Sequence, residues 1–170
     1  MNEELKFIAD GMLGKLTRWL RILGYDVEFK PYEEDEKLLD LAKKTGKVLL
    51  TSDIELYKKA VKLNIKAFLV NGKSEVENLA KISEKFSLNL DIEEVEETRC
   101  PKCNFKLKMV SPEEVRDKVP KTTLKTYKEF WVCTNPKCGK VYWQGSHWKK
   151  IGKTLKEVKN LVNKTKSNPF

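Results

Sequence analysis

The sequence predicts an α/β domain with a mostly parallel central sheet, followed by a small module held together by zinc. Over residues 1–95, short apolar segments alternate with segments whose apolar residues recur at helical spacing, which is typical of a parallel sheet with helices on both faces. Four cysteines then follow in two pairs, each pair beside a proline or a glycine, which indicates the zinc module. The charge changes at the same division, because residues 1–95 carry 16 Lys and Arg against 18 Asp and Glu, whereas residues 96–170 carry 18 against 7.

Strands and helices are expected to alternate through the α/β domain. Glycines at 24 and 46 end the first two helices, where a residue of left-handed conformation is common. Ser74 and Glu77 form a capping box that opens the fourth helix. The apolar segment 48–51 is typical of a strand buried on both faces. The predicted strands are residues 5–9, 25–29, 48–51 and 67–70, and the predicted helices are residues 12–23, 35–46, 54–63 and 74–86.

Three parts are expected along the chain. An acidic run at residues 91–97 separates the α/β domain, residues 1–95, from the zinc ribbon, residues 96–150. The insert between the cysteine pairs contains Pro112 and Pro120, so part of it is expected to be loop. From Gly152 onward, apolar residues at helical spacing predict a short amphipathic helix, so that residues 151–170 form a C-terminal helix and polar tail.

The cysteine spacing predicts a structural zinc site. Two residues separate Cys100 from Cys103, four separate Cys133 from Cys138, and 29 lie between the pairs. Four thiolates complete the tetrahedral shell of zinc, and such a closed site supplies folding energy to a module too small to fold alone. Redox-active pairs and unligated thiols are the alternatives.

Lysines and aromatic residues are interleaved around the cysteines. Basic side chains bind phosphates and aromatic faces stack on unpaired bases, so the ribbon is expected to bind an unpaired nucleic-acid strand. The alternatives are a lysine-rich solvated surface and an aromatic core of the ribbon itself. His147 is the only histidine, and a lone histidine is more often structural than substrate-binding.

Three aspartates are expected at one edge of the sheet. Asp10 follows the first strand, Asp53 follows the third, and Asp35 opens the helix after the second. The carboxyl ends of parallel strands share an edge, and three carboxylates gathered there need a divalent cation such as Mg²⁺ or Mn²⁺ among them. Lys15 and Arg18, in the first turns of the next helix, lie within reach of a phosphate. Each aspartate is, alternatively, only a helix cap.

Several motifs that occur in order resemble the mutator-seven C-terminal ribonuclease family, whose members are PIN-like proteins with an attached zinc ribbon. The resemblance covers about residues 6–150 and rests on segments 10–26, 35–42, 46–53, 100–103 and 138–147. It implies a PIN-like three-layer fold, carboxylate-bound Mg²⁺ or Mn²⁺, and RNA cleavage. Ser52 departs from the pattern, because a basic or amide residue is expected before the aspartate.

The resemblance also implies roles for single residues. Asp10, Asp35 and Asp53 match the acidic positions of the family, and its polar signature positions correspond to Lys15, Arg18 and His147.

We therefore expect a metal-dependent ribonuclease that hydrolyses single-stranded or loop RNA, with a structural zinc and a catalytic Mg²⁺ or Mn²⁺. A non-catalytic RNA-binding adaptor is the main alternative. A receiver-like domain is disfavoured, because Asp10 lacks a neighbouring acid and only four strands are clear. No apolar stretch is long enough to span a membrane, and the chain start lacks a secretory signal, which predicts a cytoplasmic protein. The sequence leaves open whether the protein forms a homo-oligomer.

Overall fold

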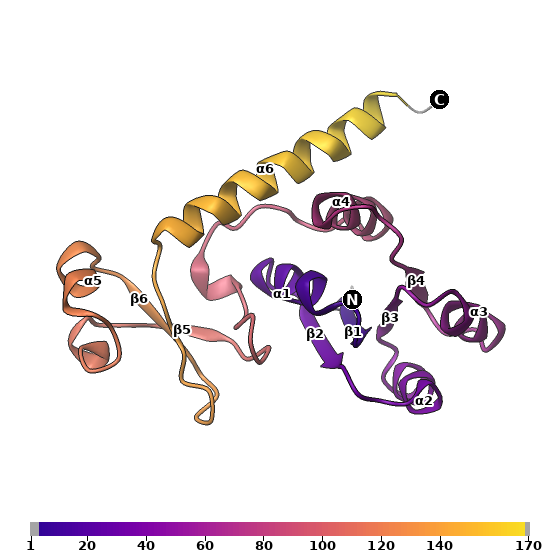
Figure 1. The fold of residues 1–170 in the computed structure, drawn as a ribbon, viewed down its shortest axis with the longest axis horizontal. Coiled ribbons are helices and arrows are strands. Elements are labelled where there is room, and N and C mark those ends of the chain that lie inside the picture. The colour runs from indigo at the N-terminus through magenta and orange to yellow at the C-terminus, as the bar shows by residue number, and fades with distance from the viewer. Residues whose placement is uncertain (1–3, 169–170) are drawn as a thin grey trace.

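The chain forms two lobes that one long helix joins (Figure 1). We describe it from a computed structural model, which covers residues 4–168; residues 1–3 and 169–170, at the outer ends of the predicted first and last parts, lie outside the description. The first lobe has a four-stranded parallel sheet in the order β2-β1-β3-β4. Its strands are β1 (Lys6–Asp10), β2 (Asp26–Lys30), β3 (Val48–Thr51) and β4 (Ala67–Leu69), each within one residue of the predicted bounds.

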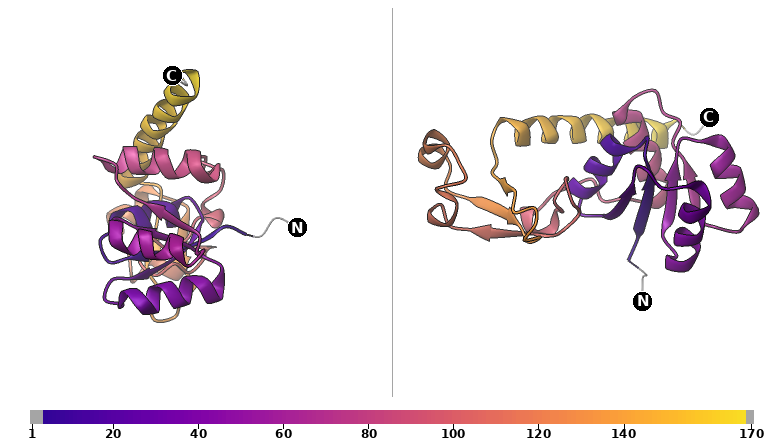
Figure 2. Two further views of the ribbon diagram at one scale, coloured as in Figure 1. Left: turned by 90° about the vertical axis from the view of Figure 1, so that its right-hand side faces the viewer. Right: turned by 60° about the horizontal axis from the view of Figure 1, so that its bottom comes forward.

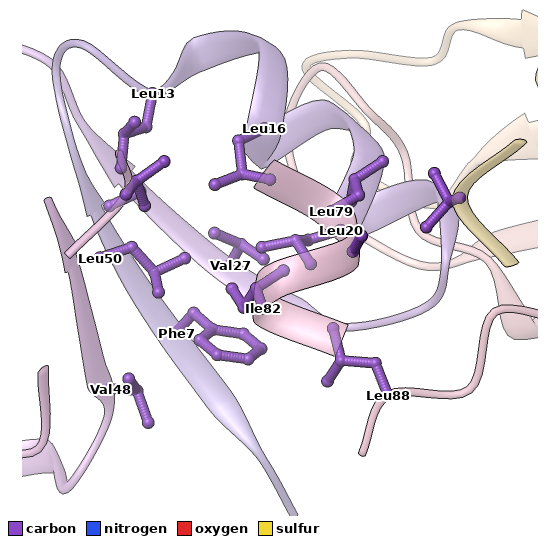
Figure 3. Close-up of a cluster of buried hydrophobic side chains, with 14 of the residues drawn as sticks. Phe7, Leu13, Leu16, Leu20, Val27, Val48, Leu50, Leu79, Ile82 and Leu88 are labelled. Atoms are coloured by element: carbon purple, nitrogen blue, oxygen red, sulfur yellow. The ribbon is translucent and has the colours of Figure 1, made fainter. Parts of the chain in front are cut away.

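Four helices cover both faces of this sheet and confirm the predicted three-layer α/β architecture. Successive side chains of a strand point to opposite faces, so Phe7 and Ala9 of β1 join one core cluster while Ile8 joins the other. The helices are α1 (Gly14–Ile22), α2 (Asp35–Thr45), α3 (Ile54–Lys62) and α4 (Glu75–Phe86). Helices α1 and α4 contribute to the core that contains Phe7, where Ile82 lies beside the ring and Leu20 and Leu79 lie beyond it (Figure 3). Helices α2 and α3 cover Ile8.

The long helix α6 (Ser146–Ser167) returns from the second lobe to the first (Figure 2). Its side chains Val158 and Val162 are buried in the same core as α1 and α4, and Lys159 forms an ion pair with Asp91. The helix begins at Ser146, six residues before the predicted start at Gly152. The last part of the chain is therefore anchored on the α/β lobe and does not form a free tail over residues 146–167.

The second lobe is a small antiparallel sheet in the order β5-β6-β7 with the four cysteines at one end. Its strands are β5 (Leu107–Val110), β6 (Phe130–Cys133) and β7 (Val141–Tyr142). The insert expected to be partly loop holds a 3-10 turn, Glu113–Val115, and helix α5 (Lys121–Thr126). Val115 and Val119 of this insert pack with Phe130, which gives the ribbon a second small core beside the one at the cysteines.

The loop between the first two cysteines, together with the residue after it, is docked on the start of β2. Asn104, in left-handed conformation with φ of 73°, accepts the N–H of Val27 at 3.1 Å and donates to the carboxylate of Asp26 at 2.7 Å. Arg21 of α1 is 6% exposed and donates to the carbonyl oxygens of Val27 at 2.8 Å and Pro101 at 3.0 Å. These contacts join the zinc-binding loop to the α/β lobe by hydrogen bonds that are shielded in part from solvent.

Candidate functional site

Asp10 and Asp53 are linked by the hydroxyl of Thr51. Asp10 is the last residue of β1 and is 8% exposed; its Oδ1 accepts the N–H of Met12 at 3.1 Å, and its Oδ2 accepts the Thr51 hydroxyl. The oxygen of that hydroxyl in turn accepts the N–H of Asp53 at 3.0 Å. Thr51, at the end of β3, is fully buried. The ends of the two central strands thus share one hydrogen-bonded connection.

Asp53 is also the N-cap of α3. Its Oδ1 accepts the backbone N–H groups of Glu55 at 2.8 Å and Leu56 at 3.2 Å. Asp53 therefore acts as a helix cap, the alternative that the sequence left open for each aspartate. Both of these hydrogen bonds end on Oδ1, so capping occupies one of the two carboxylate oxygens.

Asp35 lies at the same edge of the sheet but has a different partner. It is the first residue of α2, its side chain is 43% exposed, and Lys59 of α3 lies 3.7 Å from its Oδ2. Within residues 4–168, the only group of three or more Asp, Glu, His and Cys side chains whose ligand atoms all lie within 4.8 Å of one another is the four cysteines. The structure thus links Asp10 with Asp53 and leaves Asp35 paired with a lysine.

The linked pair flanks the point where the strand order reverses. The chain leaves β1 for β2 on one side and later returns to β3 on the other, so β1 and β3 form the switch point of the sheet. Open α/β folds bind ligands in the crevice outside the carboxyl ends of the strands at such a point. We call this region, with Asp10, Asp35, Thr51 and Asp53, the aspartate edge.

Exposed apolar side chains border the aspartate edge. Met12, in the loop after β1, is 82% exposed, and Tyr32, in the loop after β2, is 98% exposed. The two loops are in close contact, because a side-chain Cβ at Gly11 would lie 2.4 Å from the carbonyl oxygen of Pro31. Sequence reasoning missed both Thr51 and Tyr32. The position of Thr51 two residues before an aspartate was the available signal for the first, and the loop position of Tyr32 after a proline was the signal for the second.

Lys15 and Arg18 lie on α1, whereas His147 lies elsewhere. The two basic side chains are exposed in the first turns of α1, close to Asp10 in the chain. His147 is exposed in the first turn of α6 and lines a cavity with Ile22, the last residue of α1. Because α1 rises about 12 Å between Gly14 and Ile22, His147 is one helix length away from the aspartate edge.

The four cysteines have the arrangement that zinc requires. Sγ of Cys100 lies 3.9 Å from Sγ of Cys138, and Sγ of Cys103 lies 3.3 Å from Sγ of Cys133. Tetrahedral coordination at about 2.3 Å places sulfurs roughly 3.8 Å apart, so the donor set fits zinc as predicted. The Tyr142 hydroxyl lies 3.0 Å from Sγ of Cys100. Burial raises the pKa of this tyrosine, so its hydroxyl keeps its proton and can donate it to a thiolate at Cys100.

In the metal-free protein the thiols do not titrate alike. Burial raises the pKa of Cys133 and of Cys138 above the ordinary value. Burial acts in the same direction on Cys103, but hydrogen bonds, first among them one from the backbone N–H of Phe105, outweigh it and lower the pKa to about 7. Arg21 donates to the carbonyl of Lys102 at 3.3 Å as well. Burial lowers the pKa of Arg21, while the thiolates of the cluster oppose this shift.

The fold and its two sites define a class: an α/β domain with acidic residues at its switch point, docked to a four-cysteine ribbon that fits zinc. Comparison with protein families identifies the class further, because residues 5–155 match the Mut7-C RNAse domain. The chain belongs to this family, as the resemblance in its motifs predicted, and the family is one of ribonucleases. No curated protein and no solved structure matches the chain significantly.

Within residues 4–168, no helix has both the length and the apolar character needed to cross a membrane.

Proposed function

We propose that the protein is a divalent-metal-dependent ribonuclease that hydrolyses phosphodiester bonds of single-stranded or loop RNA. The observation that carries this proposal is the Asp10–Thr51–Asp53 connection at the switch point, in a chain that belongs to a ribonuclease domain family. We also propose an intracellular location, because zinc-binding thiols persist where the environment is reducing.

The donor set of the aspartate edge is suited to Mg²⁺ or Mn²⁺. Both cations prefer oxygen ligands, and Mg²⁺ commonly binds through one or two carboxylates together with waters and substrate phosphates. Asp10 and Asp53 would hold such a cation, with Asp35 as a further ligand once it is released from Lys59. A bound cation would supply an activated water and would neutralise the charge that develops on the phosphodiester.

The remaining residues of the edge have roles in binding and orientation. The Thr51 hydroxyl and the Met12 N–H donate to the two oxygens of Asp10, which holds this carboxylate in one orientation. Lys15 and Arg18 bind phosphates of the strand. Tyr32 is almost fully exposed, which favours stacking on an unpaired base and hence a single-stranded substrate.

The ribbon aids RNA binding through its positive charge. Residues 96–150 carry 13 Lys and Arg against 6 Asp and Glu, an excess of 7 basic groups, and such a surface attracts a polyanion. In this proposal residues 1–95 are the nuclease part and residues 96–150 are the RNA-binding ribbon, and the last part, residues 151–170, contains the rest of α6 up to Ser167, which packs on the α/β lobe.

A cleavage assay tests the proposal. The wild-type protein is expected to cut labelled single-stranded RNA only when Mg²⁺ or Mn²⁺ is added, and Asp10→Asn and Asp53→Asn are expected to abolish cleavage. Asp40→Asn, on the exposed face of α2, is the matched control and should leave cleavage unchanged. Cleavage that persists in Asp10→Asn, or that needs no divalent cation, would contradict the proposal.

A non-catalytic RNA-binding adaptor is the second candidate. Two observations favour it: Asp53 is already used as a helix cap, and Asp35 is already paired with Lys59. An adaptor would bind RNA with equal affinity in the wild type and in Asp10→Asn, and neither protein would cut it under any metal condition.

A further inference from the structure

A cavity of about 410 Å³ lies where the two lobes and α6 meet. It is enclosed by the end of α1, the segment that leads into the ribbon, the ribbon sheet and the first turns of α6. Its lining includes Ile22, Arg99, Trp131, Trp143, His147 and Trp148. Cavities of this size, with apolar and aromatic walls and few polar groups, are typical of small-ligand sites.

Trp131, which lines the cavity, has a buried hydrogen-bond donor without an acceptor. Trp131 is 3% exposed, and its indole Nε1 is buried and forms no hydrogen bond with any residue of the described range 4–168. Buried indole N–H groups usually have a partner, and an unsatisfied buried donor is costly. A ligand with an acceptor atom, such as a nucleobase carbonyl or ring nitrogen, would supply that partner after a small movement of the wall.

A second wall of the cavity is the N-terminus of α6. This helix is 22 residues long, its N-cap Gly145 provides no side-chain cap, and its first turn contains no acidic residue. Gly145, Ser146 and His147 all line the cavity. The free N–H groups and the positive end of the helix dipole attract a phosphate, and the exposed Lys149 lies in the same turn.

The aromatic side chains around the cavity provide stacking surfaces. Trp143 and Trp148 are partly exposed at its rim, and Trp143 lies directly against the start of α6, since a Cβ at Gly145 would be 2.9 Å from its Nε1. Any of the nucleobases can stack on such a ring, and each base stacked in this way adds substantially to the affinity for a single strand.

A row of side chains on α1 connects the cavity with the aspartate edge. Lys15, Arg18 and Ile22 follow at spacings of three and four residues, which aligns them along one face of the helix. The two basic residues are exposed, and Ile22 lines the cavity. A phosphate backbone that follows this row would pass from the aspartate edge to the ribbon over about 12 Å.

We propose that the cavity binds one unpaired nucleotide of the RNA, with its base stacked on Trp143, an acceptor atom at the indole N–H of Trp131, and its phosphate at the N-terminus of α6. This inference rests on the proposed function in one respect, that RNA is the substrate. It adds a binding site remote from the cut, so the protein holds a strand at two points that α1 separates.

Binding is measured with the inactive Asp10→Asn protein, so that the result does not depend on cleavage. Replacing Trp143 by Ala is expected to weaken the binding of a fluorescent single-stranded RNA by about 5- to 100-fold. Trp143→Phe keeps a stacking ring and should retain most of the affinity, which separates stacking from loss of fold. Phe105→Ala is the matched control, because Phe105 is an exposed aromatic residue of the ribbon outside the cavity.

Two further arms identify the ligand and separate this proposal from the proposed function. Adenosine or uridine monophosphate should quench the tryptophan fluorescence of the zinc-loaded Asp10→Asn protein, whereas inorganic phosphate alone should not. Photo-crosslinked 4-thiouridine RNA should label the segment 131–151. Unchanged RNA affinity in Trp143→Ala would overturn the proposal. Failure of the wild type to cut RNA, with Trp143→Ala still weakening binding, would overturn the nuclease function alone.

Discussion

The zinc centre and the aspartate edge differ in how far the chain alone completes each site. At the zinc centre, four sulfurs come from two short segments of the ribbon and lie within 4.8 Å of one another. At the aspartate edge, the carboxylates come from three successive strand–helix units, and each has its own partner in Thr51, the N-terminus of α3 or Lys59. The first arrangement is a closed site that serves folding. The second retains anionic oxygens at a switch point, as a site that receives an external ligand does.

The largest difference between the two regions is expected when zinc is removed. Structural zinc contributes on the order of 10 kcal/mol to folding, so chelation should unfold the ribbon while the α/β sheet remains folded. Hydrogen exchange followed by mass spectrometry should lose protection in β5, β6 and β7 and keep it in β1 and β3. Adding zinc back should restore the protection of these ribbon strands in the wild type, whereas adding Mg²⁺ should not. Zinc should not restore this protection in Cys133→Ser. Full protection of β6 after chelation would contradict the structural role.

The pH dependence of zinc uptake has a definite sign. Burial raises the pKa of Cys133 and Cys138 in the metal-free protein, so both thiols hold protons at pH 7 and must lose them to bind zinc. Zinc binding should therefore release protons and weaken as the pH falls. Calorimetry in buffers of different ionisation enthalpy measures the number of protons released, and a value of zero would contradict the thiolate site.

The next largest effect, a loss of stability, is expected when the contacts between the ribbon and the α/β lobe are removed. Arg21→Ala removes a buried guanidinium that donates to the carbonyls of Val27 and Pro101, and leaves both oxygens without this donor. We expect a loss of about 3 kcal/mol or more in the free energy of unfolding, measured by urea denaturation. Arg116→Ala removes an exposed arginine whose carboxylate partner is Glu113, and should change stability by less than about 1 kcal/mol. Equal losses in both variants would show that the docking of the ribbon is not stabilising.

A smaller effect tests the connection within the aspartate edge. Thr51→Val keeps the side-chain shape but leaves the N–H of Asp53 and one oxygen of Asp10 without their hydroxyl partner. Stability should fall by about 1–3 kcal/mol, and the rate of RNA cleavage should fall with RNA affinity unchanged. Thr45→Val is the control, since the hydroxyl of Thr45 binds the carbonyl of Leu41 on an exposed turn of α2. A Thr51→Val protein with wild-type cleavage would show that the connection is only structural.

The smallest effect is expected at the border of the edge. Tyr32 is 98% exposed, so Tyr32→Ala should leave the free energy of unfolding within about 0.5 kcal/mol of the wild type. Loss of stacking should weaken the binding of single-stranded RNA by about fivefold or more, measured by fluorescence anisotropy with Asp10→Asn. Tyr32→Phe should bind like the parent protein, and an unchanged affinity in Tyr32→Ala would remove this residue from the RNA path.

Much of the fold could be predicted because local patterns and global packing agree. The apolar segment of β3 is buried at every position, and the left-handed Gly46 and the Ser74 cap end and begin helices where the sequence indicated. The zinc site could be predicted for a similar reason, since its ligands lie in short local pairs.

Other features depend on tertiary contacts that carry no local signal. Gly152 was predicted at a helix start but lies inside α6, where the burial of Leu155 and Val158 outweighs its low helix propensity. The pairing of Asp35 with Lys59 depends on the relative placement of two helices. The buried position of Arg21, a charged residue on a helix next to an exposed row, could be recognised only once the ribbon was docked.

The most direct test of the central claim is a crystal of the wild-type protein soaked with Mn²⁺ and measured at the manganese and zinc absorption edges. We expect zinc within the four sulfurs and manganese between the carboxylates of Asp10 and Asp53. Zinc at the cysteines with no manganese at the aspartate edge, in crystals whose carboxylates are accessible to solvent, would contradict the claim.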